Sequence, residues 1–395
     1  MIDLGFTFSR LLPVLPHLLI SLISVVILTP LISKLAFKYK ALDLKVVSGV
    51  RTSNFENIEN LIPRLGGLGV SIVFTVIMYL VYGFNFFTIL LGISIGILTI
   101  AGFLDDIYDL PAWMQFCLQL IAVSLIVIVG GVRIENIQIA NFSLNFIGFE
   151  YFFNVFDILF KIVFPADIIT IFWVMIIINA MNWVAGIDAL EELMSIIAGI
   201  TLSFIAIKLN RLEFIPLIAI YTGSLMGFTL YNLPPAKIYS GTIGNIIYGF
   251  LLSILAIKID GKMTTSILLL AIPVVDFVWV LLGRLVRYKV YNPVKLMSIS
   301  GNHHLHHRLG EMNFSTWQIL FIELSLFLMF ASLAYLSAGF DIAVVAGIFS
   351  FAVLVVLFGL LSYKSKRKRN NKSEKTLEIK KETEIKQTPD REYRY

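Results

Sequence analysis

Apolar residues follow one another in long runs along this chain, and short stretches between the runs hold most of the charged residues. A run of about 18 or more residues with almost no charge is long enough to cross a bilayer as a helix. The pattern therefore predicts an all-α integral membrane protein, a polytopic bundle of about 10–11 transmembrane helices. The apolar segments are 11–33, 66–83, 86–104, 112–131, 167–183, 187–207, 213–231, 241–258, 265–287, 315–337 and 340–362.

Two stretches depart from this pattern. Polar and apolar residues alternate from Val132 to Ile139 within the segment 132–166, which predicts a short strand or hairpin. The neighbouring stretch 149–160 is aromatic and is expected to lie along the membrane interface. Residues 364–395 hold 12 Lys and Arg against 6 Asp and Glu, so we expect a disordered basic tail after a membrane domain spanning 1–363.

Composition excludes an ordinary soluble enzyme. Only 14% of the residues are charged and the mean hydropathy is +0.87, whereas soluble proteins carry roughly a quarter charged residues. The net charge of +5 comes from the tail, so it does not indicate nucleic-acid binding. A single cysteine, Cys117, excludes an internal disulfide.

The positive-inside rule predicts which side each loop faces. With the N-terminus outside, 24 of the 31 Lys and Arg residues fall in cytoplasmic loops, at helix ends facing them or in the tail. We therefore expect a cytoplasmic C-terminus in a multi-pass protein of the plasma membrane. The predicted cytoplasmic loops are 34–65, 104–111, 184–186, 232–240 and 288–314.

An acidic cluster closes the third apolar segment at this cytoplasmic face. Asp105 and Asp109 share a helix face, and Asp106 lies about 100° round the helix. Crowded carboxylates near a low-dielectric boundary repel one another unless a cation or a donor offsets them, and Mg²⁺ is the usual oxygen-liganded partner. A solvated acidic loop is the alternative interpretation.

Amide and acidic side chains also lie near the cytoplasmic ends of other segments. Asn179 and Asn182 are three residues apart on one helix face, where they could bond neighbouring helices or bind a metal or a sugar hydroxyl. Asp188 and Glu191 begin the next segment, where the helix dipole also favours a simple capping role. Asp276 lies within a segment, and an Arg or amide partner would explain it as well as a function would.

Four of the five histidines form one run. His303, His306 and His307 have the spacing that presents three imidazoles on one helical turn, and His304 lies between them. A zinc site is one interpretation, but no cysteine or carboxylate adjoins the run. The other is a phosphate-binding turn in which the imidazoles and Arg308 donate to anionic oxygens.

Basic residues beside glycines provide further candidate phosphate donors. Arg64 precedes Gly66 and Gly67 at the start of the second segment. Lys237 lies shortly before Gly241, at the start of the eighth. Glycine at a helix start suits close approach to an anion, and it suits helix packing equally well.

Taken in order, these motifs resemble the polyprenyl-phosphate N-acetylhexosamine-1-phosphate transferases (glycosyltransferase family 4). The resemblance covers roughly residues 50–310. Residues 102–109 resemble the aspartate-rich motif of the family, 179–191 its Asn-rich motif and 303–309 the histidine motif of its bacterial GlcNAc-type branch. Ala185-Gly186 and Glu191 are more similar to the dolichol-type branch.

The resemblance implies transfer of a sugar-1-phosphate, with GlcNAc-1-phosphate expected, from a UDP-sugar to a polyprenyl phosphate with release of UMP. It implies cytoplasmic active-site loops and an Mg²⁺ cofactor, with Mn²⁺ as an alternative, and it leaves a homodimer open. The implied catalytic residues are Asp105, Asp106 and Asp188, and the implied metal ligands are Asp106 and Asn182. The implied substrate-binding residues are Arg64, Asn179, Lys237, His303, His304, His306, His307 and Arg308.

Two positions depart from the family pattern. Thr242 stands where the family has a metal-binding Asp, and Gln115 stands where it commonly has a Lys. The loss of one anion and one cation is charge-balanced. It leaves open a catalytically impaired paralogue that binds lipid phosphate or a partner enzyme. A transporter is the third hypothesis, and it is disfavoured because the polar residues gather at one membrane face.

Overall fold

The computed structural model describes residues 9–44, 46–47, 50–51, 61–139, 142–155, 158–260, 263–289, 304–338 and 359. Within them, 8 helices are long and apolar enough to cross a membrane, which confirms a multi-pass all-α protein. The segment predicted at 340–362 and the tail lie outside the described residues, apart from Gly359. The principal helices are α2 (Leu15–Tyr39), α3 (Gly66–Tyr82), α4 (Phe86–Tyr108), α5 (Ala112–Ser124), α6 (Ala166–Val184), α7 (Leu190–Lys208), α8 (Ile215–Asn232), α9 (Gly241–Asp260), α10 (Met263–Leu269), α11 (Ala271–Tyr288), α13 (Leu305–Glu311) and α14 (Thr316–Ser337).

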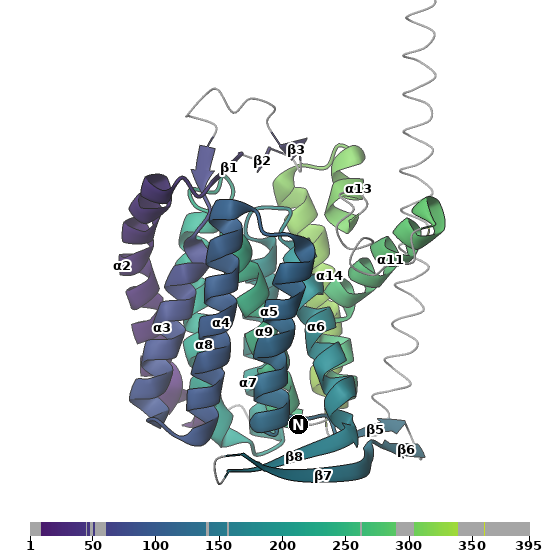
Figure 1. Ribbon diagram of the computed structural model, residues 1–395. Helices are drawn as coiled ribbons and strands as arrows, with labels where there is room; N and C mark the ends of the chain where they lie inside the picture. Colours follow the sequence, from purple (N-terminus) through teal and green to yellow (C-terminus); the bar gives the residue numbers. More distant parts are fainter. Residues whose placement is uncertain are drawn as a thin grey trace, which may run out of the picture.

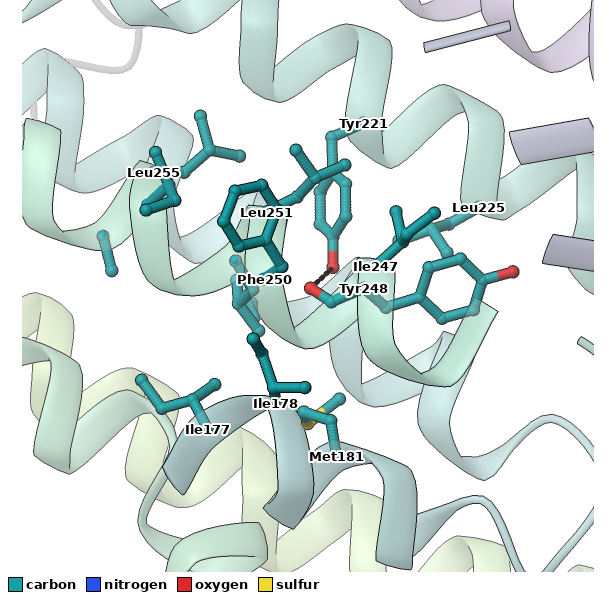
Figure 2. Packing of buried hydrophobic residues seen from close by; sticks show 14 of the residues in the cluster. Ile177, Ile178, Met181, Tyr221, Leu225, Ile247, Tyr248, Phe250, Leu251 and Leu255 are labelled. Atoms are coloured by element: carbon teal, nitrogen blue, oxygen red, sulfur yellow. Dashed lines mark hydrogen bonds between the residues drawn. The ribbon is translucent and has the colours of Figure 1, made fainter. Parts of the chain in front are cut away.

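Helix α9 forms the centre of the bundle, because 89% of its most apolar 18-residue stretch is buried. It packs against α3, α4, α6 and α7. Its residues Tyr248 and Phe250 are fully buried, and the hydroxyl of Tyr221 on α8 donates to the backbone oxygen of Tyr248 at 3.1 Å (Figure 2). The start of α9 lies at one end of the bundle, beside the start of α3 and the end of α4.

The segment predicted at 265–287 divides into two helices at Leu270. Pro273 lies just after the break. It has no backbone N–H, and its ring conflicts with the carbonyl of the residue four positions earlier. Helix α11 leans away from the bundle after the break (Figure 1). Hydropathy alone does not distinguish this arrangement from one continuous span.

Two hairpins lie at the end of the bundle where α6 begins (Figure 1). β5 (Asn136–Ile139) pairs with β6 (Phe142–Asn145), and β7 (Ile147–Val155) pairs with β8 (Ile158–Pro165), all antiparallel. The strand prediction for Val132–Ile139 is therefore confirmed over Asn136–Ile139. β7 exposes Phe149 and Tyr151, and its position along the membrane interface stays a prediction.

The opposite end of the bundle contains pairing that the sequence pattern did not predict. β1 (Leu42–Leu44) runs antiparallel to β4 (Leu61–Pro63), with β2 (Val46–Val47) and β3 (Val50–Arg51) beside them. Beyond β4, Gly66 N donates to Tyr239 O at 2.9 Å and Gly67 N donates to Ser240 O at 2.7 Å. A Cβ on Gly67 would lie 2.1 Å from the nitrogen of Gly244, so only glycine permits this contact. We call this backbone contact of 66–67 with 239–244 the α3–α9 junction.

Candidate active site

Asp106 lies where α4 ends, against the α3–α9 junction. Its Oδ1 accepts from Arg64 Nε at 2.9 Å and from the backbone N–H of Thr242 at 2.9 Å, and Arg64 Nη2 also lies 2.9 Å away. Burial opposes the charge of Arg64, but Asp106, Asp43 and Asp105 more than offset it and raise the pKa of the guanidinium. The ion pair therefore joins the last turn of α4 to the start of α3.

Asp105 binds both residues that depart from the family pattern. Thr242 Oγ1 donates to its Oδ2 at 2.6 Å, and Gln115 Nε2 donates to its Oδ1. The backbone N–H of Leu110 also donates to Oδ1, at 2.9 Å. Two residues 127 positions apart thus share one buried carboxylate. We call Arg64, Asp105, Asp106, Gln115 and Thr242 the acidic network.

Glycine at position 241 leaves a cradle of backbone beside Asp106 that is too tight for a side chain. Gly241 has φ +69°, and a Cβ there would lie 2.0 Å from Arg64 O and 2.5 Å from Asp106 Oδ2. Asp106 Oδ2 is buried and has no hydrogen-bond partner within the described part of the chain. An orphaned carboxylate oxygen beside such a cradle fits a divalent cation held by one carboxylate and completed by water and substrate phosphates.

Asn182 is connected to this cradle through Asn245. The amide groups of the two residues lie 3.0 Å apart. With its nitrogen facing Glu191 Oε2 and Gly241 O, both at 2.9 Å, Asn245 bonds the Asn-rich motif to the start of α9. Asn182 is only partly buried, so its amide is available to a ligand.

Asp188 holds the loop before α9. Its Oδ2 accepts from the backbone N–H of Ala236 at 2.9 Å, and Asn232 bonds the adjacent Ala189 N–H and Ile238 O. Lys237 lies on this loop with its side chain exposed. Asp188 is thus a buried anchor of the loop that carries Lys237.

Asn179 connects two neighbouring helices. Its amide donates to Met175 O at 2.8 Å and to Gln119 Oε1 at 3.2 Å, and both amide side chains are buried. This bond joins α6 to α5, which is the interhelical role considered for it.

The described part of the histidine run forms a second cluster beside the Asn-rich motif. His306 is buried with its Nε2 against Gly186, where a Cβ would lie 2.3 Å from that nitrogen. Burial, with the nearby His307 and His304, lowers the pKa of His306 well below its ordinary value. The imidazole is therefore neutral at pH 7.

His304, His307 and Arg308 surround His306. The rings of His304 and His306 stack with centroids 5.6 Å apart, and His307 lies 4.3 Å from His306. Arg308 lies over the ring of Trp279 at 5.7 Å. His303 lies outside the described residues, so its expected role stays a prediction.

Sequence reasoning did not predict the contacts of four contributors to these clusters. Gln115 and Thr242 were recognised only as departures, and Asn245 was given no role in the site. Asp276 was singled out with an Arg or amide partner as one explanation, whereas its partners here are His304 and the N–H of Leu305. The one local signal for Thr242 was its position at the start of a helix directly after Gly241, where a backbone N–H is free to bind a carboxylate.

Comparison with known proteins finds a family match over the region that contains the acidic network. The model of glycosyl transferase family 4 matches residues 87–260, which include Asp105, Asp106, Asn182 and Thr242. The chain is 28% identical over 315 residues, 78% of its length and 80% of its relative's, to the "Probable undecaprenyl-phosphate N-acetylglucosaminyl 1-phosphate transferase" of Bacillus subtilis.

Shorter matches come from two streptococcal proteins, each named phospho-N-acetylmuramoyl-pentapeptide-transferase. The protein of Streptococcus mutans is 32% identical over 178 residues, 42% of this chain and 48% of that protein. The protein of Streptococcus uberis is 29% identical over 187 residues, 45% and 53% of the two chains. The chain therefore spans about half the length of these two relatives.

Proposed function

Since this chain belongs to glycosyl transferase family 4, we propose that it transfers a sugar-1-phosphate, GlcNAc-1-phosphate in our expectation, from a UDP-sugar to a polyprenyl phosphate. An oxygen of the lipid phosphate forms a bond to the β-phosphorus of the donor. The bond from that phosphorus to the bridging oxygen breaks, and its electron pair leaves with UMP. The products are a polyprenyl-diphosphate sugar and UMP.

The observation that carries this proposal is the acidic network at the end of α4. The reaction brings two polyanions together, so the site must offset their repulsion and stabilise charge on the transferred group. Arg64 is a cation fixed beside that point by Asp106, and its Nη2 lies 3.4 Å from the hydroxyl of Thr242. The lipid phosphate has its second pKa near 6 and is largely dianionic at pH 7, so attack requires no strong base.

We assign the cation site to Asp106 Oδ2, with Asn182 supplying an amide oxygen. The orphaned oxygen and the cradle at Gly241 support Mg²⁺ here, with Mn²⁺ as the alternative. A bound Mg²⁺ supplies charge neutralisation to the phosphates. Asp105 holds the start of α9 and the start of α5 against the end of α4, because Thr242, Leu110 and Gln115 donate to its two oxygens.

The histidine cluster and Arg308 are proposed to bind the phosphates from the opposite side, with Lys237 at the entrance. The site faces the cytoplasm in this proposal, with the N-terminus outside the plasma membrane, because Lys and Arg gather in the loops at this end. A soluble nucleotide donor then enters from the cytoplasm and the prenyl chain from the bilayer.

UMP release by the purified protein tests the proposal, with UDP-GlcNAc, undecaprenyl or dolichyl phosphate, and Mg²⁺. We expect release that requires lipid and metal and is lost in Asp106→Asn. Asp109→Asn is the matched control, because Asp109 belongs to the same motif but is exposed. An absence of release across a panel of UDP-sugars, or equal loss in both variants, would contradict the assignment.

A further inference from the structure

Helix α13 begins at a residue that does not cap it. His304 is its N-cap, in extended conformation, and the His304 side chain makes no capping hydrogen bond. The first N–H groups of a helix need acceptors, and removing a cap costs about 1 kcal/mol. The acceptor here comes from another helix, because Asp276 Oδ1 on α11 accepts from the N–H of Leu305 at 2.9 Å.

The same carboxylate also orients the ring of His304. Asp276 Oδ2 lies 2.7 Å from His304 Nδ1, and both side chains are buried. An ionised carboxylate can only accept, so the proton must be on Nδ1 and the lone pair of a neutral ring on Nε2. The ring is held further by Trp183, edge-on at 5.3 Å, and by the stacked His306.

We propose that Asp276 is a positioning residue that caps α13 and fixes the proton of His304 on Nδ1, so that Nε2 is the nitrogen that exchanges a proton with the site. Nε2 accepts while the ring is neutral and donates to a phosphate oxygen once the ring is protonated. Asp276 touches no substrate in this proposal and acts through His304. The consequence for catalysis rests on the proposed function, whereas the cap and the tautomer do not.

Charged groups from each neighbouring helix share this environment. Glu323 of α14 faces Asp276 and is itself buried. His306 and His307 adjoin His304 on α13. Arg284 of α11 stacks on Trp183 at 4.3 Å. The pH profile of activity is therefore compared between the parent protein and the variants of Asp276.

Two substitutions separate the cap from the tautomer. In Asp276→Asn the amide oxygen still accepts from Leu305 N–H, but the amide nitrogen donates to Nδ1 and moves the proton of the neutral ring to Nε2. In Asp276→Ala both contacts are lost. Asp167→Asn is the matched control, because Asp167 is a buried carboxylate that accepts from Val163 N–H at the other end of the bundle.

Nitrogen NMR of histidine-labelled protein in detergent reads the tautomer, and hydrogen exchange reads the protection of the Leu305 amide. We expect an Nδ1–H ring in the parent and an Nε2–H ring in Asp276→Asn, with protection nearly unchanged. Protection should fall about fivefold in Asp276→Ala. The control should match the parent in both measurements. An unchanged tautomer in Asp276→Asn, or unchanged protection in Asp276→Ala, overturns the proposal.

UMP release supplies the catalytic measurement. Carboxylates that orient metal-binding histidines are worth about 10- to 100-fold, and we expect a loss of similar size in kcat for Asp276→Asn, with an altered pH profile. A loss confined to KM, with the same pH profile as the parent, would refute positioning. If the parent itself releases no UMP, the proposed function fails while the NMR and exchange measurements still decide the role of Asp276.

Discussion

The hydroxyl of Thr242 can be removed with little change in side-chain shape by the substitution Thr242→Val. This hydroxyl donates to Asp105 Oδ2 at 2.6 Å, and both residues are buried. The other two donors to Asp105 bind Oδ1, so Oδ2 loses its hydrogen bond and water has little access to replace it. A hydrogen bond to a charged group contributes about 1.5–3 kcal/mol. The ratio of folded to unfolded protein should therefore fall about 10- to 150-fold.

Unfolding in mixed detergent and SDS micelles, followed by circular dichroism, measures this change. Thr229→Val is the control, because the equally buried hydroxyl of Thr229 donates to Leu225 O within its own helix. That substitution should change the free energy of unfolding by no more than a few tenths of a kcal/mol. Thr242→Ser should recover most of the loss. If Thr242→Val costs no more than the control, the hydroxyl does not hold Asp105.

Three further outcomes are expected. Thr242→Asp adds a carboxylate beside Asp105 and Asp106, so thermal stability measured in EDTA should fall. Either added Mg²⁺ or the second substitution Gln115→Lys should restore it. If the effects of Thr242→Asp and Gln115→Lys on stability simply add, the two positions are not coupled. Gly67→Ala should lower the free energy of unfolding by more than about 1 kcal/mol because its Cβ meets the backbone of α9. Gly96→Ala should not destabilise the protein, because among the described residues its Cβ would meet nothing within 4 Å beyond its own helix backbone and chain neighbours. The pKa of His306 is lowered in the folded state, so the unfolded chain takes up the proton first as pH falls below about 6.5. Thermal stability should thus decrease as the pH falls from 7.5 to 5.5, and the decrease should be smaller in His306→Asn. An equal decrease in the parent and in His306→Asn would argue against a buried neutral ring at His306.

The sequence was sufficient to predict the helices and the motifs that carry the site. Long apolar runs leave a membrane-embedded backbone one way to satisfy its hydrogen bonds, so hydropathy predicts helices directly. Asp105 and Asp106 stood out because three acids ended an apolar segment. The alternation from Val132 to Ile139 predicted a strand because successive side chains of a strand point to opposite faces.

The contacts between distant segments could not be predicted in this way. Thr242 lies 137 residues from Asp105, and Asp276 lies 28 from His304, so no local pattern marks either pair. Sequence reasoning treated Thr242 and Gln115 as lost charges, whereas the structure makes them donors to one carboxylate. Pairing of β1 with β4 likewise depends on the fold that brings residues 42–44 beside 61–63.

The separation of Asp106 from Thr242 also determines the order in which the site is completed during synthesis. Arg64 and Asp106 are 42 residues apart and are available to each other early, but Thr242 is made 136 residues after Asp106. At about 5–20 residues per second, the ribosome needs roughly 7–27 s to bridge that interval. Throughout it, Asp105 lacks the hydroxyl that binds its Oδ2, and Gly66 and Gly67 lack the backbone oxygens of Tyr239 and Ser240 to which they donate. Arrival of α9 is therefore the step of biogenesis that closes the acidic network, and nascent chains ending before residue 241 contain the carboxylates without the finished site.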